Sequence, residues 1–237
     1  MNNAPRSAKA KSEEQQHITH HVADFLRRFR LVLLGILGAV IVVVIAVAIW
    51  TAVTESQMKD STLAIENAEN ELSTYQSEQD QTKKAALEKT LTASLDKIIV
   101  SWPKLYAAQK AHAIKAQLDE TAKDWAGAEK EWAAASNLLK NDFLAPIALQ
   151  SAAAAAEERG ADDKAAGYYK TLLAKYGKNT VGVVHAYFAL GRISEESKDY
   201  TAAVGYYEKI VAGYPNDDWT KLAKDRILAL RSQGLVK

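Results

Sequence analysis

The chain has no cysteine among its 237 residues. This excludes disulfides, thiol nucleophiles and Cys-ligated metal sites, and also lipoprotein-type attachment, which needs a cysteine. Proline is nearly as scarce, with four residues, and three of them (Pro103, Pro146, Pro215) stand beside helix-start or helix-stop signals. Because Ala, Leu, Lys and Glu dominate between them, the composition predicts an all-α protein.

An excess of either charge is also missing, since the formal net charge is +1. We therefore expect no nucleic-acid surface. Phosphate loops, dinucleotide fingerprints and hydrolase motifs do not occur, so we predict no cofactor, no metal and no enzyme activity. Ser94-Leu95-Asp96-Lys97 and Ser101-Trp102-Pro103-Lys104 fit the S-x-x-K pattern of acylating enzymes. The partner motifs S-D-N and K-T-G are absent, which favours a chance match.

One long apolar run is present, LVLLGILGAVIVVVIAVAIW at Leu31–Trp50. Twenty helical residues rise about 30 Å, the thickness of a bilayer's hydrocarbon core. Arg27, Arg28 and Arg30 precede the run, which predicts a cytoplasmic N-terminus and an extracytoplasmic remainder. A cleaved signal peptide ending near Ala46–Ala48 is the alternative, but its apolar part is usually only about 7–15 residues long.

Two further patterns near the run have weaker meaning. Gly35 and Ala39 form a small-xxx-small pair of the kind that lets membrane helices associate. His17, His20 and His21 share one helical face, but no acidic residue or cysteine completes a metal site at matching spacing, so interfacial histidines are favoured.

These patterns divide the chain into four parts. We predict a disordered cytoplasmic tail at 1–24, a juxtamembrane and transmembrane helix at 25–54, a helical stalk at 55–102 and a repeat domain at 103–237. Within the stalk, Leu63–Tyr75 carries a weak apolar seam and Leu87–Trp102 a strong one. The many polar residues from Glu66 to Gln81 favour a solvated helix over pairing with a second copy.

Internal repeats appear after the stalk. Residues 123–132 read KDWAGAEKEW, 164–169 read KAAGYY and 198–207 read KDYTAAVGYY. A small residue followed four positions later by an aromatic aligns them, and the pairs recur after 37 and 38 residues: Ala128/Trp132, Ala165/Tyr169 and Ala203/Tyr207. Such a period is typical of stacked helical units.

The third copy resembles the tetratricopeptide repeat, through Tyr187, Leu190-Gly191, Tyr200, Ala203, Tyr207 and Pro215. The resemblance implies an α-solenoid of about three helix pairs, at 104–122/125–140, 142–159/162–176 and 181–197/200–213, closed by a capping helix at 218–231. The first two copies depart from the pattern, with Lys115-Ala116 and Ala153 in place of Leu-Gly and Gly.

The arrangement of tail, single span and exterior repeats also resembles the ancillary translocon subunit of bacteria, the YfgM type. The ending YPNDDWTKLAKDRILAL resembles envelope-assembly proteins of the BamD and CpoB type. These resemblances imply a scaffold in the bacterial inner membrane with a periplasmic repeat domain. Its partners would be translocon, chaperone or envelope-assembly proteins. The alternative is a self-assembling structural stalk, hence a homo-oligomer.

In tetratricopeptide-repeat proteins, partners lie along the first helix of each pair. The corresponding positions here are Lys110, Gln117, Glu120, Gln150, Glu157, Glu158, His185, Phe188, Arg192, Glu195 and Glu196. The five glutamates predict a groove for a Lys- or Arg-bearing segment, whereas solvated helix faces are the alternative.

Overall fold

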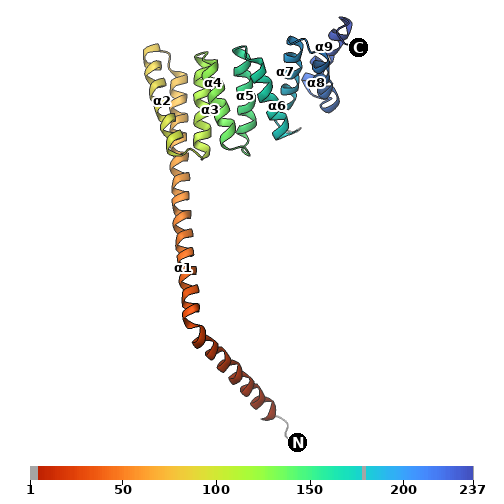
Figure 1. Ribbon diagram of the computed structural model, residues 1–237. Coiled ribbons are helices and arrows are strands. Elements are labelled where there is room, and N and C mark those ends of the chain that lie inside the picture. The colour runs from red at the N-terminus through yellow and green to blue at the C-terminus, as the bar shows by residue number, and fades with distance from the viewer. Residues whose placement is uncertain (1–4, 178–179, 237) are drawn as a thin grey trace. The chain divides into compact units, whose positions relative to one another are not determined.

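The structure is a computed structural model that describes the backbone of residues 5–177 and 180–236, with side chains from Arg27 onward except Leu33. All regular structure in these ranges is helical, as the composition predicts (Figure 1). The helices are α1 (Pro5–Ser77), α2 (Gln81–Ser101), α3 (Tyr106–Thr121), α4 (Trp125–Leu138), α5 (Leu144–Glu158), α6 (Asp162–Tyr176), α7 (Val183–Glu196), α8 (Tyr200–Gly213) and α9 (Asp218–Ser232).

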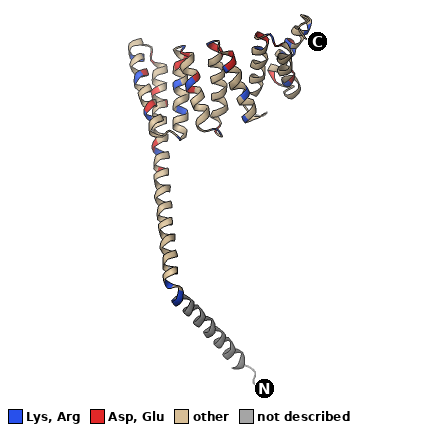
Figure 2. Cartoon of the chain, in the orientation of Figure 1, with Lys and Arg blue, Asp and Glu red and all other residues tan. Residues whose placement is uncertain are grey.

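The chain divides into two compact units between Gln57 and Met58. The first unit is the N-terminal part of α1, which is long and apolar enough to cross a membrane by length and composition. Figure 2 shows this stretch uncharged after the basic residues that precede it. None of the apolar window is buried within the molecule. The helix α1 begins at Pro5, so it also runs through residues 5–24, for which the sequence predicted disorder.

The second unit, Met58–Lys237, contains the repeats, and we call its described part the array. The predicted helix pairs correspond to α3/α4, α5/α6 and α7/α8, and the predicted capping helix corresponds to α9. The bounds of α6 and α8 equal the predicted ones, and the other helix ends differ from the predictions by at most two residues. The all-α fold of paired helices is therefore confirmed.

Aspartates cap the starts of the second helices α4 and α8. Asp124 accepts a hydrogen bond from the Gly127 N–H, and Asp199 accepts one from the Ala202 N–H, both over 3.0 Å. Each caps a helix N-terminus whose first N–H groups lack partners within the helix. The preceding Lys123 and Lys198 adopt positive φ values of 59° and 62°. The repeated Lys-Asp dipeptide thus encodes the turn within a helix pair.

The array has no single central core. Its buried apolar residues form four clusters in chain order, centred on α1–α3, on α3–α5, on α5–α7 and on α8–α9. The small-plus-aromatic pairs that define the repeat lie inside these clusters: Ala128/Trp132, Ala165/Tyr169 and Ala203/Tyr207. Each helix pair therefore packs on its neighbours alone, as in repeat proteins generally.

The predicted stalk differs from the structure. The C-terminal part of α1 and the whole of α2 form a further helix pair that packs on α3. Ile65, Ala68 and Tyr75 of the weak seam are at most 6% exposed, and Leu91 and Leu95 of the strong seam are fully buried. Residues 61–77 are thus part of the array and not a solvated helix, because the apolar face of α2 packs against their apolar side chains.

Candidate functional site

The predicted groove residues lie on α3, α5 and α7, the first helices of three successive pairs. Gln117, Glu158 and Glu196 are exposed. The other eight are half-buried: Lys110, Glu120, Gln150, Glu157, His185, Phe188, Arg192 and Glu195. Their burial shows that most of these side chains contact the rest of the array.

Two of the predicted glutamates hydrogen-bond to an aromatic residue of their own helix pair. Glu120 Oε1 accepts from Trp132 Nε1 over 2.7 Å, and Glu195 Oε1 accepts from the Tyr207 hydroxyl over 2.6 Å. Both bonds join residues twelve positions apart. These two glutamates therefore join the first and second helices of their own pairs by a hydrogen bond.

Glu157 and Tyr169 occupy the same positions in the α5/α6 pair. The Glu157 Oε1 atom and the Tyr169 hydroxyl are both buried. Burial raises the pKa of Glu157, although the nearby Arg192 partly offsets this effect. Burial also raises the pKa of the Tyr169 hydroxyl.

Ion pairs connect the first helices of neighbouring pairs. Lys110 of α3 pairs with Glu69 of α1 over 2.7 Å. Arg192 of α7 pairs with Glu157 of α5, and Arg192 Nη1 also reaches Glu196 Oε1 at 2.6 Å. These contacts neutralise part of the predicted acidic surface, so its pull on a basic segment is weaker than the glutamate count indicates.

The last such pair joins α7 to α9. Arg226 Nε donates to Glu195 Oε1 over 3.1 Å, and its guanidinium also contacts Glu195 Oε2. Burial alone would raise the pKa of Glu195, but hydrogen bonds from Arg226 and Tyr207 outweigh it, so the pKa lies below its ordinary value. Glu195 therefore stays ionised while holding α9 against α7.

The aromatic side chain of Trp219 on α9 covers two predicted groove residues. Its ring centroid lies 5.2 Å from that of His185 and 4.8 Å from that of Phe188. Phe188 also packs on Tyr207 at 5.3 Å. Burial, with Arg192 nearby, lowers the pKa of His185, which favours its neutral form. His185 and Phe188 thus help to dock α9.

Two buried carboxylates on α4 were not predicted. Glu129 accepts hydrogen bonds from Arg159 Nε over 2.6 Å and from the Tyr168 hydroxyl over 3.1 Å. Glu131 lies 2.6 Å from His112 Nδ1 and 3.4 Å from Lys115 Nζ. Their partners are distant in sequence, and glutamate on a helix usually indicates an exposed face, so no local signal identified them.

The enzyme-like serine pattern has a structural role at one position. Ser94 Oγ donates to Glu71 Oε1 over 3.3 Å, between α2 and α1, while Leu95 is fully buried. Within the described side chains, no group of three His, Asp or Glu residues is placed to hold a metal. The side chains of His17, His20 and His21 lie outside that part.

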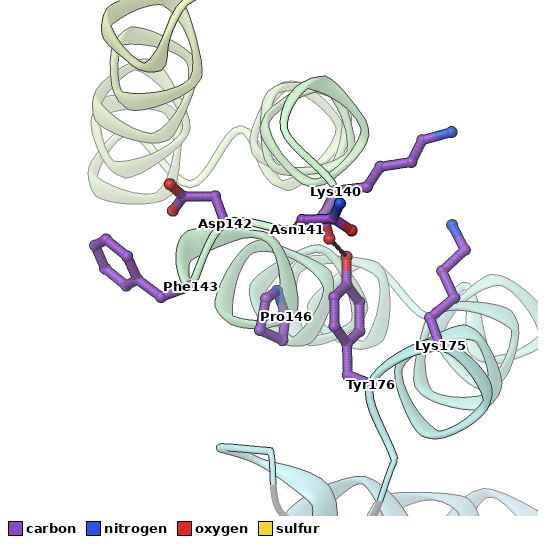
Figure 3. Close-up of a pocket in the computed structure, with 7 residues that line it drawn as sticks. All are labelled: Lys140, Asn141, Asp142, Phe143, Pro146, Lys175 and Tyr176. Carbon is purple, nitrogen blue, oxygen red and sulfur yellow. Dashed lines mark hydrogen bonds between the residues drawn. The ribbon is translucent and has the colours of Figure 1, made fainter. Parts of the chain in front are cut away.

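An open hollow of about 620 Å³ lies where α4 leads into α5 (Figure 3). Its lining residues are Lys140, Asn141, Asp142, Phe143, Pro146, Lys175 and Tyr176. The Tyr176 hydroxyl donates to the Lys140 carbonyl over 2.8 Å and so joins α6 to the turn after α4. Figure 3 shows Lys140 and Lys175 extending to the same side, away from Phe143. The hollow combines two ammonium groups with an apolar wall.

Comparison with known proteins finds a similarity over part of the chain. The chain is 27% identical over 150 residues to a "TPR repeat-containing protein" of Treponema pallidum (strain Nichols), a match that spans 63% of this chain and 62% of that relative. It thus covers less than two thirds of the relative's length. No family model and no solved structure matches the chain. The similarity supports a helical scaffold of the tetratricopeptide-repeat type.

Proposed function

We propose that the protein is a membrane-anchored scaffold that binds other proteins through its helical array, outside the cytoplasm, and assists protein translocation or envelope assembly. The main support is the array itself, in which helix pairs place a row of first helices side by side. Arrays of this kind present extended binding surfaces to protein segments. The similarity to a protein named for its TPR repeats agrees with this role.

The open part of the first-helix row is its exposed polar side chains. Gln117 on α3 and Glu158 on α5 are exposed and stand apart from the ion pairs described above. A partner can contact them without breaking an internal bond of the array. The surface is less acidic than the sequence predicted, because Glu157 and Glu195 already have cationic partners.

The anchor supports the location. The apolar stretch at Leu31–Trp50 has arginines before it, and the positive-inside bias then leaves the array on the extracytoplasmic side. Since the chain has no cysteine, single cysteines at Ser7 and Glu158 would test this topology. A membrane-impermeant maleimide should label Glu158→Cys in intact cells but Ser7→Cys only after lysis. The opposite pattern would overturn the proposed location.

In-cell photo-cross-linking tests partner binding. A photoreactive residue at 117 or 158 should capture translocon, chaperone or envelope proteins, identified by mass spectrometry. Matched positions are Lys130 and Lys170, which are exposed on the second helices α4 and α6. Capture of the same proteins from all four positions would show chance proximity and contradict the proposed surface.

The self-assembling stalk is the second candidate. Its weak seam, however, is covered by the protein's own α2, since Ile65, Ala68 and Tyr75 are buried. Self-association would then depend on the span, through Gly35 and Ala39. Capture of the chain alone from positions 117 and 158 would favour this alternative.

A further inference from the structure

The two edges of the array differ in chemistry. One edge, the intra-pair edge, consists of the turns within helix pairs at 78–80, 122–124, 159–161 and 197–199. The other, the inter-pair edge, consists of the turns after α2, α4 and α6 with the adjoining helix ends. Antiparallel helices place these two sets of turns at opposite ends of the pairs, as Figure 1 shows for α3–α6.

Apolar side chains gather on the inter-pair edge. Val100, Phe143 and Val181 are 79%, 67% and 70% exposed there. Met58 and Tyr106 are also exposed on this edge, where they line one hollow together with Leu105. These five are more than half of the large apolar side chains that the structure shows exposed beyond Gln57, whereas the intra-pair turns contribute none. Scattered exposed apolar residues are normal, but this concentration on one edge indicates a contact surface.

Lysines accompany the apolar residues. Lys104, Lys140 and Lys175 are exposed on the same edge, and Lys140 and Lys175 line the same hollow as Phe143, on its other side (Figure 3). The intra-pair turns carry more acidic residues beside their basic ones: Glu78, Asp80, Lys123, Asp124, Arg159, Lys198 and Asp199. In the described turns after α2, α4 and α6, Asp142 is the one acidic residue, and it lines the same hollow as Lys140 and Lys175. Exposed apolar and aromatic side chains next to lysines are typical of surfaces that lie at the headgroup level of a bilayer.

The chain connection brings a bilayer within reach. Met58 is only eight positions after Trp50, the end of the apolar run. That connection spans about 12 Å as helix and about 27 Å at full extension. The connection from the apolar run enters the array at Met58, which lies on the inter-pair edge. This edge is therefore the part of the array that directly follows the apolar run, whatever angle α1 takes there.

We propose that the inter-pair edge rests on the membrane surface, with Phe143 and Val181 among the headgroups and Lys140 and Lys175 on anionic phospholipid. This inference depends on the membrane anchor of the proposed function. The contact would hold the array flat on the membrane and leave the intra-pair edge exposed. Salt weakens the attraction between each lysine and an anionic surface.

Fluorescence quenching by spin-labelled lipid tests the contact on the full chain. Single cysteines replace Phe143 or Val181 on the inter-pair edge and Ala122 or Ser197 on the intra-pair edge, and each carries the same environment-sensitive fluorophore. A label at Ile49, inside the apolar run, reports insertion. In vesicles containing phosphatidylglycerol, we expect labels at 143 and 181 to be quenched at least twofold more than those at 122 and 197.

The lysines have a matched control. K140Q/K175Q should reduce quenching at position 181, whereas K130Q/K170Q, on the second-helix faces, should leave it unchanged. Strong quenching at 49 with none at 143 and 181 would overturn the edge contact while keeping the anchor. Failure of the protein to float with the vesicles would overturn the anchor and the edge contact together. If the labels at 143 and 181 were as shielded in detergent, without a bilayer, as they are in vesicles, a protein contact would account for the shielding. That result would refute the lipid contact.

Discussion

The Tyr207 hydroxyl donates a hydrogen bond to Glu195 Oε1 over 2.6 Å, across the α7/α8 pair. The same carboxylate receives Arg226 from α9. One glutamate therefore stabilises both its own helix pair and the docking of the last helix. Trp132 and Glu120 repeat the first of these bonds in the α3/α4 pair.

Replacing Tyr207 by Phe should lower the free energy of unfolding by about 1–2 kcal/mol, because a half-buried carboxylate loses a donor. The matched control is Tyr206→Phe, whose ring keeps its contact with the Lys209 ammonium at 5.0 Å. Denaturation of the detergent-solubilised protein, followed by helical circular dichroism, measures both. Equal effects of the two changes would contradict a structural role for the Tyr207 bond.

Gly191 tests the close approach of α7 and α8. A Cβ atom at this position would overlap the Tyr207 ring. Gly191→Ala should therefore destabilise the protein by about 1–3 kcal/mol through overpacking. At Gly205 a Cβ meets no atom within 4 Å, so Gly205→Ala should raise stability by up to about 1 kcal/mol through helix propensity. Thermal melts of the two variants should shift in opposite directions, and a tolerated Gly191→Ala would refute the tight contact.

Ile65 and Leu63 distinguish a packed helix pair from a solvated stalk. Ile65 is 5% exposed, whereas Leu63, two positions earlier, is 56% exposed. Ile65→Ala should cost about 2–4 kcal/mol because it leaves a cavity against α2 and α3. Leu63→Ala should change stability by less than about 0.5 kcal/mol. Chemical denaturation decides between them, and an unaffected Ile65→Ala would return residues 61–77 to the stalk interpretation.

Glu129 gives a pH-dependent prediction. Burial would raise the pKa of its carboxyl, but hydrogen bonds from Arg159, Tyr168 and Lys164 outweigh burial, so the folded pKa lies below the ordinary value of 4.5. The unfolded chain then binds a proton more readily, so the stabilisation is complete above pH 4.5 and disappears as the pH falls through the folded pKa. Glu129→Gln should cost about 1–3 kcal/mol at pH 7 and progressively less below pH 4.5.

Unfolding measured from pH 7 to pH 3 checks this. The control is Glu208→Gln, since the Glu208 carboxylate is 56% exposed and its pair with Arg231 spans 3.4 Å. That change should cost less than about 0.5 kcal/mol at any of these pH values. A pH-independent cost of Glu129→Gln would mean that its charge contributes nothing to folding.

Several features of the fold followed from short-range patterns. The small-plus-aromatic pairs at 37- and 38-residue intervals located the pairs α3/α4, α5/α6 and α7/α8, because only tight helix packing requires that combination. The structure adds that the Lys-Asp dipeptides at 123–124 and 198–199 form the turns before the second helices α4 and α8. The first pair was missed as a pair, since Glu66–Gln81 has the polar composition of a solvated helix.

The candidate groove was less predictable. The sequence indicated free acidic groups at Glu157 and Glu195, yet Arg192 of α7 and Arg226 of the capping helix α9 neutralise them. An exposed glutamate and one paired across 30 or more positions have the same local sequence context. Which of the two is present depends on which helix faces meet.

The sequence by itself determined the apolar run, the absence of cysteine chemistry and the repeating helix pairs, because each depends on composition or on spacings within one or two turns of helix. The tertiary structure decided the rest. It placed the C-terminal part of α1 and the whole of α2 in the array, paired Glu157 and Glu195 with arginines, and gathered Phe143 and Val181 on one edge. These outcomes depend on contacts between segments far apart in the chain, and burial sets their energies.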